Sequence, residues 1–236
     1  MVDDIVPGLL DSIEKDFDTR TYNSTKLKNA LKKLQDNRAS YKDVNDYAVE
    51  VGRILSDVFK KHVTVDKLPD GRMYFNIAER ILNPTIGKNY DLIVGYASDV
   101  QTQLNNAANT RIRPQVPETN QGRIDGIINK IANEADFENV KWLLEEPIIN
   151  LSQSIVDDII QSNASFHMSA GLRPKITRVV SGHQPCDWCK NLAGTYEYNE
   201  APREIYQRHD RCRCTVEYVP GDGRRQDVWS KDWNTN

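Results

Sequence analysis

The stretch Ser40-Tyr-Lys-Asp-Val-Asn-Asp-Tyr-Ala-Val-Glu-Val-Gly-Arg-Ile-Leu-Ser-Asp-Val-Phe59 carries the clearest structural signal in the chain. Its apolar residues recur every three or four positions, which is the spacing of one face of an α-helix. Ser40 or Asp43 is expected to begin this helix, because their side-chain oxygens can accept hydrogen bonds from the free N–H groups of the first turn. We interpret the stripe as a buried helix face rather than a cofactor-binding surface.

Helical spacing continues on both sides of this stretch. Further helices are predicted over 5–17, over 24–34 with Ser24 as the cap, over about 88–106, over 124–131, briefly over 137–144, and from Pro147 to about 168–171. Turn signals at Leu68-Pro-Asp-Gly71 and Asn83-Pro-Thr85 predict breaks before the 88–106 helix. The segment 111–117 contains two prolines and is expected to be irregular.

The pattern changes after residue 172. Three short β-branched or alternating segments, 175–180, 195–198 and 215–219, are predicted as strands. The expected fold class is therefore α+β. A helical domain of five to seven helices spans 1–171, a small β-containing, zinc-knuckle-like module spans 172–220, and an irregular tail spans 221–236.

Composition excludes several classes of protein. The 236 residues carry a net charge of -3, and the mean hydropathy is -0.64, so no overall charge draws the chain to nucleic acid. Residues 171–236 hold eleven Lys and Arg against nine Asp and Glu, a net +2, which leaves -5 for the first 170 residues. No apolar run approaches the roughly 20 residues of a membrane span. The acidic start Met-Val-Asp-Asp is unlike a secretory signal, so we expect a reducing cytoplasmic environment.

All four cysteines lie in the C-terminal module. The sequence reads Cys186-Asp-Trp-Cys189, then nineteen residues, then His209-Asp-Arg-Cys212-Arg-Cys214. Paired thiolates at this spacing are typical of tetrahedral zinc sites, with a hairpin expected to return the second group to the first. Five candidate ligands compete for four positions, so His209 and Cys214 are alternatives. A fully protein-filled site is structural, because catalysis needs an open position.

Two other interpretations of the cysteines stay open. They are reduced thiols packed in a small core, or they form a disulfide. A cysteine nucleophile would need a partner base. The nearby histidines are His183 and His209, and the spacing aligns neither with one cysteine.

The same residues carry a resemblance to a known family. The strings Cys186-Asp-Trp-Cys-Lys-Asn-Leu-Ala-Gly194 and Arg208-His-Asp-Arg-Cys-Arg-Cys214 resemble the C-terminal signature of minor head, or head morphogenesis, proteins of tailed bacteriophages, the MuF-like group. The match covers about a fifth of the chain. The helical part resembles the group only in being long, helical and polar.

The resemblance implies a structural minor capsid protein rather than an enzyme. It would associate with the portal or major capsid protein, in the capsid interior or at the portal vertex of the virion, after assembly in the host cytoplasm. It implies a role in head assembly or in DNA retention and ejection. Carried over by position, Cys186, Cys189, His209, Cys212 and Cys214 correspond to the metal cluster, and Leu192 and Gly194 to packing and turn residues.

Two alternatives come from the basic residues of the module. Arg203, Arg208, Arg211, Arg213, Arg224 and Arg225 are interleaved with aromatic residues, which favours contact with packaged double-stranded DNA and a role as a DNA-binding accessory factor. Surface ion pairing of the same arginines is equally compatible with the sequence. A metal-dependent nuclease would need further histidines, and the chain has only four.

Overall fold

A computed structural model describes residues 4–181, 186–209 and 211–221. The α+β class is confirmed: a helical body is followed by a small antiparallel sheet. The α-helices are α1 (Val6–Asn23), α2 (Thr25–Gln35), α3 (Tyr41–His62), α4 (Phe75–Ala107), α5 (Gln121–Ala132), α6 (Glu146–Ser169) and α7 (Asp187–Asn191). The strands are β1 (Lys175–Val179), β2 (Gly194–Glu197) and β3 (Thr215–Val219). The 3₁₀ turns are η1 (Val65–Lys67), η2 (Pro69–Gly71), η3 (Phe137–Asn139), η4 (Lys141–Leu144) and η5 (Arg203–Tyr206).

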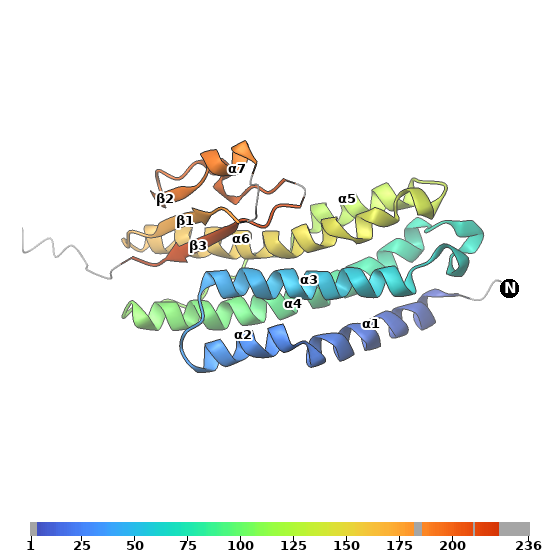
Figure 1. Ribbon diagram of the computed structural model, residues 1–236, viewed down its shortest axis with the longest axis horizontal. Coiled ribbons are helices and arrows are strands. Elements are labelled where there is room, and N and C mark those ends of the chain that lie inside the picture. The colour runs from blue at the N-terminus through green and yellow to red at the C-terminus, as the bar shows by residue number, and fades with distance from the viewer. Residues whose placement is uncertain (1–3, 182–185, 210, 222–236) are drawn as a thin grey trace, which may run out of the picture.

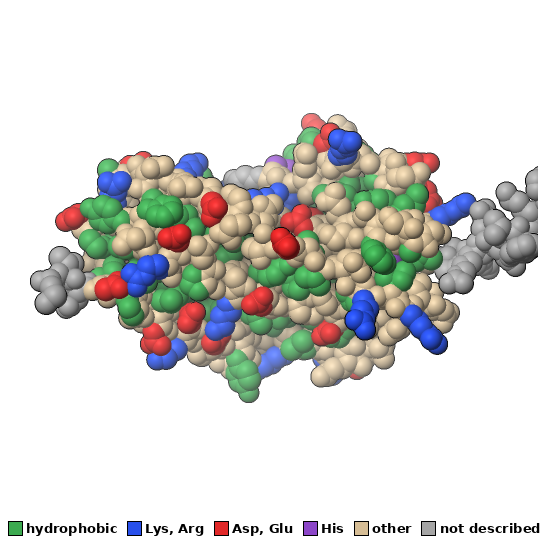
Figure 2. Space-filling view, turned by 180° about the vertical axis from the view of Figure 1, so that it is seen from behind, with side chains coloured by type: hydrophobic (Ala, Val, Ile, Leu, Met, Phe, Trp, Pro, Cys, Tyr) green, Lys and Arg blue, Asp and Glu red, His purple; other side chains and the backbone are tan. Residues whose placement is uncertain are grey.

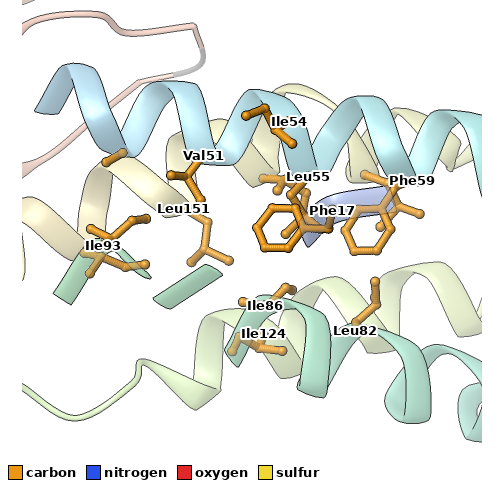
Figure 3. Close-up of a cluster of buried hydrophobic side chains, with 14 of the residues drawn as sticks. Phe17, Val51, Ile54, Leu55, Phe59, Leu82, Ile86, Ile93, Ile124 and Leu151 are labelled. Atoms are coloured by element: carbon orange, nitrogen blue, oxygen red, sulfur yellow. The ribbon is translucent and has the colours of Figure 1, made fainter. Parts of the chain in front are cut away.

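The long helices form a bundle in which their axes are roughly aligned (Figure 1). Helix α3 is central, because it packs against α1, α2, α4 and α6. Its stripe residues Val51, Leu55 and Phe59 are fully buried and belong to the same core cluster as Phe17 of α1 and Leu82 of α4 (Figure 3). The sheet and α7 lie over α6 at one end of the bundle.

Local signals fixed several helix boundaries as predicted. The Ser24 hydroxyl accepts a hydrogen bond from the Leu27 N–H at 3.4 Å at the start of α2. At the start of α3 the Ser40 N–H donates to the Asp43 carboxylate at 2.9 Å, so both candidate residues take part in the cap. Pro147 stands in the first turn of α6, where its missing N–H costs nothing.

The predicted break at Asn83-Pro-Thr85 is wrong. Helix α4 runs without interruption through Pro84, although an interior proline costs about 3 kcal/mol. Ile81, Leu82 and Ile86 are at most 1% exposed, and burying each such side chain contributes about 1.5–3 kcal/mol. Continuous burial on both sides of Pro84 therefore outweighs the proline penalty.

Helices α3 and α6 approach closely where Gly52 faces Ser152. A Cβ atom on Gly52 would lie 2.5 Å from the Ser152 Oγ and 3.1 Å from the Ile149 Cα. The Ser152 hydroxyl donates to the Ile148 carbonyl, and the Asn89 amide of α4 donates to Ser152 at 3.1 Å. The close packing of α6 against α3 at this point therefore requires glycine at position 52, because any larger residue would clash with Ser152.

The sheet has the strand order β2-β1-β3, with both pairs antiparallel. The predicted hairpin between the two cysteine groups is therefore wrong, because β2 and β3 lie on opposite edges of β1. Ile176, Val216 and Tyr218 join the same hydrophobic cluster as the helices, and β3 contacts α3 and α6. The sheet is thus anchored on the bundle, which fixes the position of the cysteines.

No helix among the described residues is long and apolar enough to cross a membrane. The prediction of an irregular tail falls mostly on 222–236, which lie outside the described residues.

Candidate metal centre

The cysteines and His209 are carried by three short segments above the sheet. Cys186 caps the one-turn helix α7, and Cys189 lies inside that helix. The Cys189 N–H points at the Cys186 Sγ at 3.4 Å, so the two-residue spacing turns both sulfurs to one side. His209 follows η5, and Cys212 and Cys214 precede β3. The anchored strands β1 and β3 therefore bring both groups together, although no hairpin joins them.

The donor atoms form two overlapping groups of three. The Cys189 Sγ lies 3.1 Å from the His209 Nε2 and 3.9 Å from the Cys212 Sγ. The Cys186 Sγ lies 3.4 Å from the same His209 nitrogen. Cys189, Cys212 and Cys214 form a second group whose sulfurs are all within 4.8 Å of one another. Cys189 belongs to both groups and is the centre of the cluster.

Three of these distances are close to those between the ligands of a tetrahedral ion. Thiolate sulfurs about 2.3 Å and an imidazole nitrogen about 2.0 Å from a metal lie roughly 3.5–3.8 Å from one another. The Cys186–His209, Cys189–His209 and Cys189–Cys212 distances are 3.1–3.9 Å, and Cys212 belongs to the second group, with Cys189 and Cys214. A disulfide needs about 2.05 Å between sulfurs, and all four cysteines are free thiols here. The five-residue cluster can hold a metal ion, as the sequence predicted.

A fully buried arginine faces the sulfurs. Arg178 of β1 is 2% exposed, and its Nη2 lies 3.7 Å from the Cys212 Sγ and 4.0 Å from the Cys189 Sγ. Its Nη1 donates to the Ile205 carbonyl, and its guanidinium lies 5.3 Å from the centre of the Trp188 ring. Among the described residues no carboxylate is within salt-bridge distance of Arg178. The nearby Asp157 is bound by Arg208.

Burial and this cation act on the thiols in opposite directions. Burial raises the pKa of Cys189 to about 12, and hydrogen bonds with Cys214 and Cys186 add to the rise. The pKa of Cys214 is lowered, although its burial acts the other way. Backbone hydrogen bonding at Ser181, hydrogen bonds from the neighbouring cysteines and the positive charge of Arg178 together lower it. Metal binding requires the thiolate forms.

Four of the six arginines predicted for nucleic-acid contact, Arg203, Arg208, Arg211 and Arg213, lie in the described residues, and they do not form one exposed surface. The side chain of Arg208 is 6% exposed, and its Nη2 lies 2.8 Å from the Asp157 Oδ1. Arg208 therefore faces the interior, contrary to its predicted phosphate-binding role, because Asp157 of α6 is buried and needs a cation. Arg213 pairs with Glu146 of α6. Arg203 and Arg211 are exposed.

Lys and Arg side chains are interspersed with Asp and Glu on the face shown in Figure 2. Contact of Arg203 and Arg211 with DNA stays a prediction. His183, Arg224 and Arg225 lie outside the described residues.

Two site residues were missed from the sequence. Arg178 shares one face of β1 with the buried Ile176, and the alternation of the strand already placed both side chains inward. An arginine at an inward-facing strand position could therefore have predicted a negatively charged group nearby, because a buried arginine needs one. Asp157 carried no such signal, because acidic residues on helices are mostly exposed.

Neither protein-family models nor curated proteins nor solved structures give a match to this chain.

Proposed function

We propose that the C-terminal module is held together by a structural zinc ion bound by Cys186, Cys189, Cys212 and His209. The observation that carries this proposal is Arg178. A buried guanidinium is costly unless an anion compensates it, and the only described groups that can do so within 4.0 Å are the sulfurs of Cys189 and Cys212. Three thiolates, a neutral imidazole and a divalent ion sum to one negative charge, which Arg178 neutralises.

Zinc is the metal that suits these ligands best. Thiolate and imidazole donors in tetrahedral arrangement are typical of zinc, whereas magnesium and calcium prefer oxygen ligands. Four protein ligands leave no open position for substrate, so the ion would stabilise the module rather than catalyse a reaction. Cys214 would then be a neighbouring thiol outside the ligand set.

Stabilisation by metal is physically reasonable for this module. Three strands of four or five residues cannot by themselves enclose a large core, and small modules often depend on a metal. The ion pair between Arg208 and Asp157 joins the module to α6. A module stabilised by metal would therefore be held in a fixed position on the helical body.

We further propose that the protein is a minor structural component of a tailed-phage head, which contacts the portal or the major capsid protein. The support is the resemblance of the string from Cys186 to Cys214 to the head morphogenesis group. A long helical body with a metal-stabilised module would serve as a rigid spacer with one anchoring end. A catalytic role is not part of this proposal.

The metal proposal is tested by native mass spectrometry of protein purified without chelator. One zinc ion per chain is expected, and metal-free protein with four titratable thiols would refute it. Cobalt substitution then separates the ligand sets. The thiolate-to-cobalt absorption should be unchanged in Cys214→Ser and altered in His209→Ala, and the reverse result would assign Cys214 as the fourth ligand.

The head-protein proposal has a separate test. The chain is co-expressed with the portal protein of the same phage, and portal rings are purified by gradient sedimentation. We expect the chain to sediment with the rings and to occur in purified virions. Its absence from virions would refute the proposal, whatever the metal content.

A further inference from the structure

A cleft of about 440 Å³ lies between α5, α6 and the C-terminal module. Helix α5 contributes Arg123, Gly126, Ile127 and Lys130, and η5 with the residues after it contributes Tyr206, Arg208 and His209. The cleft is thus formed by segments distant in sequence, and it borders the candidate metal centre through His209. Neither the proposed zinc site nor the proposed head function uses it.

The interior of the cleft is mainly apolar. Ile127, Leu143, Pro147 and Leu151 line it. Gly126 leaves part of it open, because a Cβ atom at that position would meet nothing within 4 Å. The hydroxyl of Tyr206 is buried and has no hydrogen-bond partner among the described residues. An apolar cleft with an unsatisfied polar group is typical of a binding site rather than of a contact with a nucleic-acid backbone.

Two cations stand at the rim. Arg123 and Lys130 are exposed, and in the described part of the chain neither has a carboxylate within salt-bridge distance. Most exposed Lys and Arg side chains elsewhere on the helices do pair, for example Lys15 with Asp11 and Arg80 with Asp4. Because Arg123 and Lys130 are seven residues apart on α5, they are separated by about 10 Å along the helix axis.

The distance between Arg123 and Lys130 indicates which kind of ligand could contact both side chains. In a peptide with the extended polyproline II conformation, residues i and i+3 lie on the same face and about 9 Å apart, so two acidic residues at this spacing can reach both cations. An apolar residue between them can then face the apolar interior.

We propose that the cleft binds an extended acidic segment of a partner protein, with the pattern acidic–apolar–apolar–acidic. An apolar side chain enters beside Gly126, and the carboxylates pair with Arg123 and Lys130. The proposal does not rest on the zinc site or on the head function.

The test uses a fluorescein-labelled hexapeptide, Gly-Glu-Leu-Leu-Glu-Gly-amide, and its matched form with both Glu replaced by Gln. Binding to the full chain is measured by fluorescence anisotropy. We expect the Glu form to bind roughly five- to tenfold more tightly than the Gln form, as two exposed ion pairs allow. The double variant Arg123→Gln with Lys130→Gln should abolish this difference.

A second pair of variants tests the apolar part. Gly126→Leu fills the cleft and should weaken both peptides at least tenfold. Its matched control is Gly95→Leu on α4, where a Cβ atom would also meet nothing within 4 Å. The charge control is Lys32→Gln with Arg111→Gln, both exposed and away from the cleft. Circular dichroism checks that each variant is folded.

Three results would overturn the proposal. The first is a dissociation constant above about 1 mM for the Glu form, which is weaker than specific docking requires. The second is equal binding of the Glu and Gln forms, which would leave a site for uncharged ligands. The third is unchanged binding in Gly126→Leu, which would place the peptide elsewhere.

Discussion

The substitution Arg178→Met tests the electrostatic argument for the metal centre most directly. It removes the cation that faces the Cys189 and Cys212 sulfurs and keeps an apolar side chain of similar length. Its effect should be large in the metal-bound protein and small in the metal-free protein, because the anion that Arg178 compensates exists only when the thiols are ionised and hold the ion.

The magnitudes follow from the contacts. In the metal-bound protein the site would keep one uncompensated buried negative charge, and loss of such a supporting group typically lowers metal affinity 10- to 100-fold. That range corresponds to about 1.4–2.8 kcal/mol. In the metal-free protein the substitution removes a buried, unpaired guanidinium, which is favourable. It also leaves the Ile205 carbonyl without its donor, which costs about 1–3 kcal/mol. These effects nearly cancel, so the change in unfolding free energy should be within about 1 kcal/mol.

Zinc affinity is measured by competition with a chromophoric chelator, and stability by urea unfolding with and without excess chelator. Arg178→Lys keeps the charge with fewer donors and should fall between the wild type and Arg178→Met. The reasoning is refuted if Arg178→Met destabilises the metal-free protein by as much as the metal-bound protein. That result would make Arg178 a packing residue only.

Three further predictions concern the body of the protein. Gly52→Ala should destabilise it by about 1–3 kcal/mol, since the new Cβ would lie 2.5 Å from the Ser152 Oγ; thermal unfolding should show recovery when Ser152→Gly is added, and no recovery would place the strain elsewhere. Asp157→Asn should cost about 3–5 kcal/mol by leaving Arg208 buried and unpaired; chemical denaturation should show a much smaller loss for Asp157→Leu with Arg208→Met, and equal losses would argue against a charge effect. The pKa of Asp16 is lowered, mainly by its hydrogen bond with Arg20, so its contribution is present above its unfolded pKa and fades as pH falls. Asp16→Asn should therefore cost about 1 kcal/mol at pH 7 after solvent screening; urea unfolding between pH 7 and 2 should show the difference shrinking with acid, and a constant difference would contradict the assignment.

Much of the architecture followed from local patterns. The stripe of α3 and the caps at Ser24 and Ser40 depend on neighbouring residues, so they could be predicted. The strands also appeared close to their predicted positions, because β-branched alternation is a local property. The break at Pro84 was predicted wrongly because local propensity favours it, whereas burial of Ile81 and Ile86 by other helices is a tertiary effect.

The sequence by itself determined the fold class and the membership of the candidate metal-binding cluster, because cysteine and histidine spacing limits which atoms can reach one ion. Only the tertiary structure decided how the two halves of the cluster meet. Strand β1 enters between β2 and β3, and packing against α3 and α6 selects that order. The tertiary structure also turned Arg208 inward to Asp157 and brought Arg178 to the sulfurs. A buried charged side chain pairs with whichever group of opposite charge lies beside it in the folded protein. Elements far away in the sequence determine which group that is.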